Sequence, residues 1–389
     1  MKIFKANGNI AFLSTYPPRE CGIATFTQDL INALNKIGII NTNVIAMKNS
    51  ENFIYDSEVI AEIEQNERSD YIDTAKKLNN SDIDLLVIEH EYGIFGGTQG
   101  EYILDLVNNL EIPVVTTLHT ILSNPDHKQR LIINTLGKKS AKVITMAKNT
   151  KKILQSVYGV DPQKIEVIHH GVPKRLIESR VSLKKEYGYE NVHVISTFGL
   201  LSPGKGIEHG IEAISKVVKD NKNVLYLILG QTHPALKEAG QAYRNKLEEL
   251  VEKLDISANV KFINKYLSKD EIIQYLQLSD IYMTPYLGRD QAVSGTMAYA
   301  VGYGKVIVST PYLYAKEMLS DGRGLLAEFN NPDSIADCIK YILQNPDKKA
   351  EMEIDTIKLG RTMYWENVAQ RYIEVFLNII KAVPQIEVV

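Results

Sequence analysis

Short apolar runs alternate along this chain with longer segments in which apolar residues recur at helical spacing. Each run spans four to seven residues and ends at a turn signal. This alternation is typical of α/β structure, in which helices cover parallel sheets. The predicted strands are residues 10–13, 43–47, 85–89, 113–118, 142–146 and 165–168, then 192–198, 224–230, 260–264, 281–285, 306–309 and 324–327. The predicted helices lie near 25–37, 69–79, 100–110, 126–136 and 148–157, then 206–219, 236–254, 269–278, 294–303, 312–319 and 331–345.

The strands form two series of about six, which predict two Rossmann-like, doubly wound parallel-sheet domains that face each other across a cleft. A polar stretch from 171 to 191, rich in Lys, Arg, Glu and Tyr, separates the two series. We therefore expect an N-terminal domain over 1–175 and a C-terminal domain over 176–365. Residues 348–381 carry the only tryptophan, Trp365, and are interpreted as one or two helices without a strand to complete.

Composition and charge exclude several classes of protein. The 389 residues include 44 Lys and Arg against 47 Asp and Glu, and a net charge of −3 gives no field that attracts nucleic acid. Two cysteines, Cys21 and Cys338, cannot form a disulfide framework or a structural zinc site. The first apolar run, 10–13, is too short for a signal-peptide core or a membrane span. We expect a cytoplasmic protein.

Three strand-end loops of the first half contain candidate binding residues. Ligands of doubly wound sheets bind at the carboxyl ends of the strands. The first loop carries Arg19 and then Gly22 at a helix start, where free N–H groups suit an anion or a sugar hydroxyl. Its Pro and Gly residues have a simpler explanation as turn formers.

The second loop of the first half carries His90, Glu91 and Tyr92 beside glycines, a composition suited to a hydroxyl-rich ligand. The alternative is a solvated surface loop. His119 follows the next strand, where it is either a hydrogen-bond donor to a ligand or a packing histidine. The histidines lack metal-ligand spacing, so no metal site is predicted.

Two loops of the second half suit an anion. Gly199 begins a loop that ends at Lys205 and Gly206 before a helix, so a point charge lies beside free backbone N–H groups. The spacing from Gly199 to Lys205 differs from that of a nucleotide-hydrolysing P-loop, so no P-loop is predicted here. The second loop ends in Ser294, Gly295 and Thr296 at another helix start. Ordinary helix capping is the alternative explanation for these hydroxyls.

Together these loops resemble the retaining, family-four glycosyltransferases of the glycosyltransferase-B fold. The resemblance spans nearly the whole chain. The motifs that carry it are Pro17-Pro18 to Gly22, Thr117-Leu118-His119, Ile168-His-His-Gly-Val172, Gly199 to Lys205-Gly206, Ser294-Gly295 and Tyr303 to Thr310. It implies that the last helix, 366–389, packs back on the N-terminal, acceptor-side domain.

The resemblance also implies roles for individual residues. Gly22 would lie under the donor diphosphate, Lys205 would neutralise it, and His119 would contact the transferred sugar. Ser294, Gly295 and Thr296 would lie where the family's helix N-terminus meets sugar and phosphate. We further predict that Gly199, Gln291 and Tyr299 bind the donor and that Arg19, His90, Glu91 and Tyr92 bind the acceptor.

Two positions depart from the family pattern. Leu200 stands where the family usually has an arginine after the phosphate-loop glycine. The usual Glu-x7-Glu pair falls on Asp290 or Gln291 and on Tyr299, which offers the ribose one hydroxyl instead of a carboxylate. We predict that Arg289 supplies the missing positive charge, as a third catalytic residue beside His119 and Lys205.

The resulting prediction is a metal-independent, retaining hexosyltransferase without a cofactor. Its donor would be a nucleotide sugar, with GDP-mannose as the first guess and a UDP-glucose donor as the second. Its acceptor would be a hydroxyl of a saccharide or lipid-linked acceptor. The alternatives are a glycoside phosphorylase or sugar-phosphate enzyme of the same fold, and a non-catalytic sugar- or nucleotide-binding subunit.

A basic stretch bears on the partners of the protein. Residues 127–160 include eight Lys or Arg and no Asp or Glu. Such a stretch suits peripheral contact with the inner face of an anionic membrane, and the alternative is a solvated helical face. No nucleic-acid partner is expected, and the pattern does not predict an oligomeric state.

Overall fold

A computed structural model describes residues 8–49, 53–232 and 237–382 of the chain. The chain divides into two compact units. Unit 1 comprises the residues up to Pro173 and those from Tyr364 onward, and unit 2 runs from Lys174 to Met363. The start of the predicted helix at 236 lies outside the described residues.

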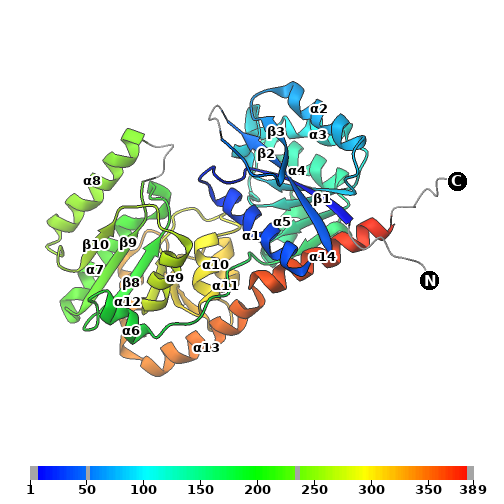
Figure 1. The fold of residues 1–389 in the computed structure, drawn as a ribbon. Helices are drawn as coiled ribbons and strands as arrows, with labels where there is room; N and C mark the ends of the chain where they lie inside the picture. Colours follow the sequence, from blue (N-terminus) through cyan, green and yellow to red (C-terminus); the bar gives the residue numbers. More distant parts are fainter. Residues whose placement is uncertain (1–7, 50–52, 233–236, 383–389) are drawn as a thin grey trace, which may run out of the picture. The chain divides into compact units, whose positions relative to one another are not determined.

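Unit 1 contains a seven-stranded, fully parallel sheet in the order β3-β2-β1-β4-β5-β6-β7. Its strands are β1 (Gly8–Ser14), β2 (Ile40–Lys48), β3 (Val59–Glu64), β4 (Leu85–His90), β5 (Val114–Leu118), β6 (Lys142–Thr145) and β7 (Ile165–Val167). Its α-helices are α1 (Gly22–Ile37), α2 (Arg68–Asn79), α3 (Ile103–Asn109), α4 (His127–Lys139), α5 (Lys148–Ser156) and α14 (Trp365–Ala382). Figure 1 shows α14, in red, beside α1.

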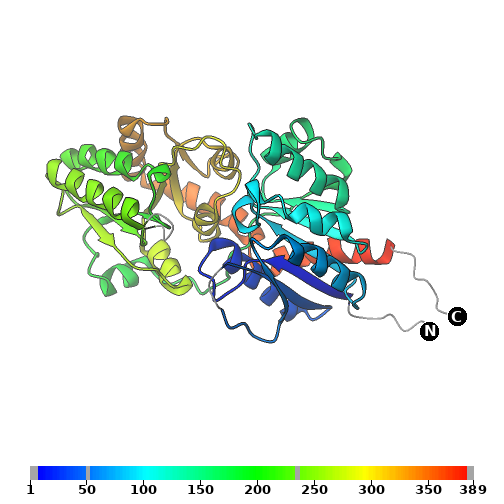
Figure 2. The ribbon, with the colours of Figure 1, turned by 90° about the horizontal axis from the view of Figure 1, so that it is seen from above.

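Unit 2 contains a six-stranded parallel sheet in the order β10-β9-β8-β11-β12-β13. Its strands are β8 (His193–Phe198), β9 (Val224–Leu229), β10 (Val260–Ile263), β11 (Ile281–Thr284), β12 (Val306–Ser309) and β13 (Gly324–Leu326). Its α-helices are α6 (Arg180–Glu186), α7 (Ile207–Asp220), α8 (Lys237–Lys253), α9 (Lys269–Leu278), α10 (Gly295–Gly302), α11 (Leu313–Met318), α12 (Pro332–Gln344) and α13 (Pro346–Thr362). Figure 2 shows this unit from above.

The predicted fold class is confirmed, because two parallel sheets alternate with helices in the predicted order. Strand β3, helix α6 and the short 3-10 helices were not predicted. Strand β3 is an edge strand with only Ile63 buried, so its sequence lacks the continuous apolar run of an inner strand. Helix α6 lies inside the polar stretch predicted as a linker, and Leu183 is its one buried large apolar residue. The first series therefore has seven strands rather than six.

The C-terminal segment forms two helices, one in each unit. Helix α14 packs on the sheet of unit 1, where the Phe376 ring lies 6.2 Å from that of Phe12 in β1. The Tyr372 hydroxyl lies 3.3 Å from the Thr117 hydroxyl of β5. At the start of the helix, a Cβ added at Gly171 would lie 2.1 Å from the Trp365 ring. Glycine at this position therefore lets the indole lie directly on the backbone.

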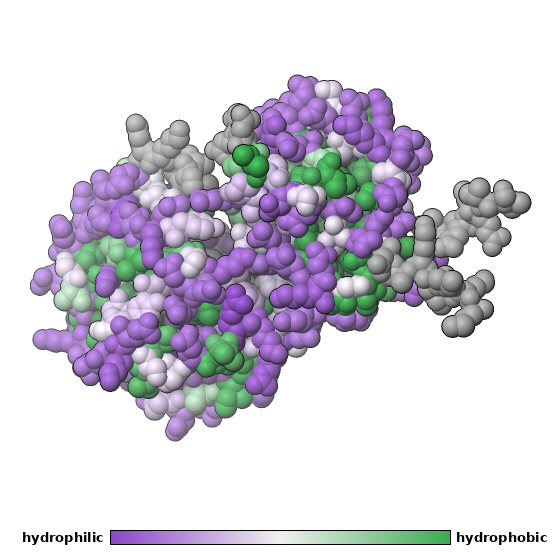
Figure 3. Space-filling view, in the orientation of Figure 1, coloured by the Kyte–Doolittle hydropathy of each residue, from purple (hydrophilic) through white to green (hydrophobic). Residues whose placement is uncertain are grey.

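The surface is largely hydrophilic on the face seen in Figure 3. None of the described helices is long and apolar enough to cross a membrane. Within the basic stretch, Lys128 pairs with Glu101 at 2.5 Å and Lys142 pairs with Glu166 at 2.9 Å. Acids outside the stretch thus balance part of its charge, and peripheral contact with a membrane stays a prediction.

Candidate active site

Each sheet has one point where its strand order reverses. In unit 1 the reversal lies between β1 and β4, and in unit 2 it lies between β8 and β11. Loops at the carboxyl ends of such strands diverge and leave room for a ligand. The predicted site residues follow these strands or their neighbours, so they form one loop cluster in each unit.

In unit 1, the loop after β1 leads directly into α1. The Cys21 sulfur caps this helix by accepting a hydrogen bond from the Ala24 N–H at 3.3 Å. Gly22 is exposed, and a Cβ added there would meet nothing within 4 Å. Arg19 is half-buried, and its guanidinium donates to the Met47 carbonyl at 3.4 Å. The first turn of α1 is therefore open to an anion or a sugar hydroxyl.

The residues after β4 differ in their access to a ligand. Glu91 is half-buried and accepts hydrogen bonds from the Tyr92 N–H at 2.9 Å and the Thr120 hydroxyl at 2.5 Å. His90 is fully buried against the rings of Tyr92 and Phe95, and its nitrogens have no hydrogen-bond partner among the described residues. Burial lowers the pKa of His90 to about 3, so the ring is neutral at physiological pH. An acceptor would reach Glu91 more readily than His90.

His119 is held by a carboxylate that sequence reasoning did not select. Its Nε2 lies 2.8 Å from Oε2 of Glu89, whose side chain is fully buried. The His119 ring also packs edge-on against Phe26, with centroids 4.8 Å apart. Because β4 and β5 are neighbours, Glu89 at the end of one strand meets the histidine that follows the other. Glu89 thus fixes the orientation of the His119 ring.

This pairing yields a prediction about the orientation of His119. If the sugar transfer expected from the sequence is correct, Glu89→Ala should lower its kcat about 10- to 100-fold, because His119 loses a buried hydrogen-bond partner. Glu89→Gln retains a polar atom at this distance and should keep more of the activity. Steady-state kinetics on both variants measure the effect, with circular dichroism to verify folding. Equal losses in both variants would indicate that the negative charge of Glu89 matters rather than the orientation.

In unit 2, glycines bring the loops after β8 and β11 together. Gly206 has φ +61°, and a Cβ there would lie 2.1 Å from the Pro285 carbonyl oxygen, so only glycine fits. The Leu287 N–H donates to the Gly204 carbonyl at 3.0 Å. Gly199, with φ +133°, lies at the end of β8, and a Cβ there would contact the Thr296 methyl at 3.4 Å. The backbone thus places Lys205 beside the loop that follows β11.

Lys205 lies in a polar cluster at the start of α10. Its ammonium is 4.0 Å from the centre of the Tyr286 ring, and the Tyr286 hydroxyl lies 2.9 Å from the Thr296 hydroxyl. Ser294 caps α10 by accepting from the Met297 N–H at 3.3 Å. A cation, hydroxyls and a helix N-terminus together suit a phosphate. Tyr286 was missed because an aromatic residue after a strand carries no chemical signature of its own.

The remaining predicted donor residues lie around this cluster in different environments. Arg289 is exposed and stacks on Phe329, with its guanidinium carbon 4.4 Å from the ring centre. Gln291 donates from its side chain to the Val293 carbonyl at 3.1 Å. The Tyr299 ring lies 6.3 Å from that of Phe198. The loop geometry therefore brings Gly199, Lys205, Ser294, Gly295 and Thr296 together, while the Arg289 side chain packs on Phe329.

Two family models match the chain. The model described as "Glycosyltransferase Family 4" matches residues 22–175, and the model described as "Glycosyl transferases group 1" matches residues 180–358. The two matches follow one another along the chain and correspond to most of units 1 and 2.

Among curated relatives, an uncharacterized glycosyltransferase of Methanocaldococcus jannaschii is 27% identical over 250 residues, which cover 62% of this chain and 60% of the relative. A D-inositol 3-phosphate glycosyltransferase of Nocardioides sp. is 19% identical over 286 residues, covering 68% of this chain and 62% of the relative. The chain thus spans less than two thirds of the length of these relatives.

Solved structures share the fold. A glycosyltransferase from Rickettsia africae superposes with a TM-score of 0.77 at 18% identity, covering 97% of this chain and 99% of that one. HepE of Anabaena, solved in complex with UDP and glucose, superposes with a TM-score of 0.75 at 16% identity. The match covers 96% of this chain and 100% of HepE. At these identities the likeness establishes the architecture alone.

Proposed function

Because this chain belongs to the family-four-like glycosyltransferases of the glycosyltransferase-B fold, we propose that it transfers a hexose from a nucleoside diphosphate sugar to a hydroxyl group. The observation that carries the proposal is the cluster at the start of α10, where Lys205 lies beside Tyr286, Thr296 and a helix N-terminus. Such a site suits a diphosphate better than a neutral sugar.

The proposed chemistry follows from where charge develops. The nucleoside diphosphate gains negative charge as the bond to the sugar breaks, so a fixed cation stabilises the transition state more than the ground state. Lys205 would supply that cation, and the N–H groups of α10 would add to it. Retention would follow from front-face attack, in which the leaving phosphate oxygen accepts the proton of the attacking hydroxyl, so no protein nucleophile is invoked.

GDP-mannose and UDP-glucose are the two donors we propose for testing. The first follows from the family resemblance, and the second is supported by the fold shared with HepE, which was solved with UDP and glucose. A saccharide or lipid-linked hydroxyl is the proposed acceptor. Tyr299 stands where the family usually places a carboxylate on the ribose, which favours a sugar-phosphate enzyme as the second candidate.

One assay separates these functions. The protein is incubated with GDP- and UDP-sugars and with hexose 1-phosphates, with and without saccharide acceptors, while release of nucleotide or phosphate is measured. We expect acceptor-dependent release of a nucleoside diphosphate. Turnover of hexose 1-phosphates alone would support the phosphorylase instead. Binding of donors without any turnover would support a non-catalytic subunit.

A further inference from the structure

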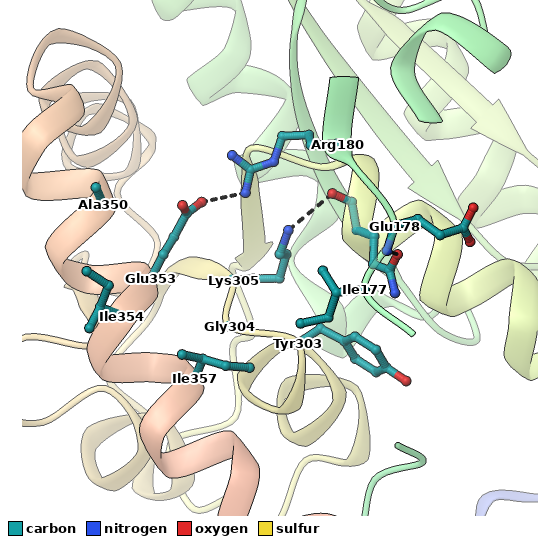
Figure 4. Close-up of a pocket in the computed structure, with 11 residues that line it drawn as sticks. Ile177, Glu178, Arg180, Tyr303, Gly304, Lys305, Ala350, Glu353, Ile354 and Ile357 are labelled. Carbon is teal, nitrogen blue, oxygen red and sulfur yellow. Dashed lines mark hydrogen bonds and ion pairs between the residues drawn. The ribbon is translucent and has the colours of Figure 1, made fainter. Parts of the chain in front are cut away.

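A pocket in unit 2 lies at the opposite edge of the sheet from the loops described above. Lys305 directly precedes β12, and Asp280 directly precedes β11, so the pocket is at the amino ends of these strands. It has a volume of about 450 Å³ and is bounded by residues 177–180 and by α13 (Figure 4). This volume is typical of sites for small molecules.

Lys305 is the buried cation of this pocket. Its side chain is almost fully enclosed, with 4% of the residue exposed. Among the described residues, the ammonium donates only to the backbone carbonyls of Gln277 and Ser279, each at 3.3 Å, and it forms no ion pair with a carboxylate. Burial and then the charge of Arg180 lower the pKa of Lys305 to about 7. A buried ammonium without a carboxylate is costly, so an anion beside it would stabilise its charged form.

The charged side chains around Lys305 leave an excess of positive charge. The cluster consists of four cations and two carboxylates: Arg180, Lys184, Lys305, Lys349, Asp280 and Glu353. Asp280 pairs with Lys184, with Lys349 at 3.4 Å and with Arg180 at 3.8 Å. Glu353 pairs with Arg180 at 2.5 Å, while the exposed Glu178 points away from the cluster in Figure 4. With Lys305 protonated, the six-residue cluster carries 4 − 2 = +2, but only Arg180, Lys305 and Glu353 of it line the pocket, together with Glu178. The buried Nε of Arg180 has no hydrogen-bond partner among the described residues.

The rim of the pocket is apolar and exposed. Ile177 and Ile354 line the pocket with 69% and 54% of their surfaces exposed. Leu176 precedes Ile177 in the chain and is 90% exposed, and Val181, four residues after Ile177, is 75% exposed. The segment is nevertheless anchored, because the Gln277 side chain donates to the Leu176 carbonyl at 3.0 Å. Large apolar side chains held in water beside a pocket are typical of a binding surface.

We propose that this pocket binds a phosphate monoester that carries an apolar group. The phosphate would lie at Arg180 and Lys305, and the apolar group would lie on Ile177 and Ile354. A phosphate dianion presents two negative charges to the two cations that line the pocket, Arg180 and Lys305, whereas a carboxylate would present one. The site is separate from Lys205 and α10, so it does not depend on the proposed transfer reaction.

Calorimetric titration of the full chain with butyl phosphate tests the proposal. We expect saturable binding, about 10-fold or more tighter than that of inorganic phosphate, because the butyl chain covers the apolar rim. Lys305→Met and Arg180→Gln should each weaken binding about 10-fold or more. Lys316→Gln, which removes an exposed lysine of the same unit, is the matched control and should bind like wild type. Lys205→Ala should also bind like wild type, because it changes only the donor cluster.

A second arm identifies the source of the phosphate. Phosphatidylcholine vesicles with and without phosphatidic acid are sedimented with wild type and with the two pocket variants. Vesicle binding that requires phosphatidic acid, Lys305 and Arg180 would assign a membrane lipid, and binding of butyl phosphate alone would assign a soluble ester. The proposal is overturned if neither probe binds, or if folded Lys305→Met and Arg180→Gln bind as wild type does.

Discussion

Replacing Lys205 with alanine is expected to lower the turnover of sugar transfer at least ~100-fold, which corresponds to about 2.7 kcal/mol of transition-state stabilisation. Lys205 lies over the Tyr286 ring, whose hydroxyl lies 2.9 Å from the Thr296 hydroxyl at the start of α10. If it stabilises charge on the departing diphosphate, kcat should fall more than KM rises, because the charge develops only in the transition state. Initial rates over a range of donor concentrations measure both constants.

The control for Lys205→Ala is Lys316→Gln, which removes one positive charge from an exposed position of α11 in the same unit. It should leave kcat unchanged. The contact of Lys205 with the Tyr286 ring is worth about 1 kcal/mol at most for a partly exposed pair, so the variant should still fold. Turnover within about 3-fold of wild type in a folded Lys205→Ala protein would remove this residue from the site.

Much of the architecture could be predicted because inner parallel strands have an unambiguous sequence signature. Strands buried on both faces, such as β4 and β12, are continuous apolar runs, and their ends are visible from glycines and polar residues. The same reasoning located the loops that carry Gly22, Lys205 and Ser294. It could not find β3, because an edge strand with exposed side chains lacks that run.

The side-chain pairings of the candidate site could not be predicted, since they depend on which strands are neighbours. Glu89 and His119 are 30 positions apart, and they meet only because β4 pairs with β5. Successive residues of a strand point to opposite faces. Glu89 therefore reaches His119, whereas His90 packs between aromatic rings. From composition alone Glu89 and His90 have the same polar character, and the sequence analysis selected His90 rather than Glu89 as a candidate binding residue.

Replacing Asp280 with alanine is expected to destabilise unit 2 by about 3–5 kcal/mol, because it leaves the buried Lys184 without its anion. Asp280 is 6% exposed and pairs with Lys184, which is itself 9% exposed, and with Lys349 at 3.4 Å. Its carboxylate also accepts the Val194 N–H at 2.9 Å, so it connects α6 and α13 to the start of β8. The melting temperature should fall by on the order of 10 °C.

The pH dependence of the stability lost in Asp280→Ala shows whether the loss comes from the charge of Asp280 or from its packing. Burial raises the pKa of Asp280, but the hydrogen bond from Lys184 and the charge of Lys349 outweigh it, so the net pKa lies below its ordinary value. The contribution of Asp280 is therefore present at neutral pH and is lost as the pH falls through that lowered pKa. The difference in unfolding free energy between wild type and Asp280→Ala should shrink in acid. A difference that stays constant across pH would instead assign the loss to packing.

The matched control is Asp333→Ala, which removes an exposed carboxylate of the same unit. Asp333 pairs with Lys216 at 2.5 Å, but 72% of its side chain is exposed, so water screens the pair. We expect a loss of about 1 kcal/mol or less, measured by urea unfolding beside Asp280→Ala. Equal losses in the two variants would contradict a buried network at Asp280. A large loss for Asp280 alone would show that Lys184 and the cations beside it depend on this carboxylate.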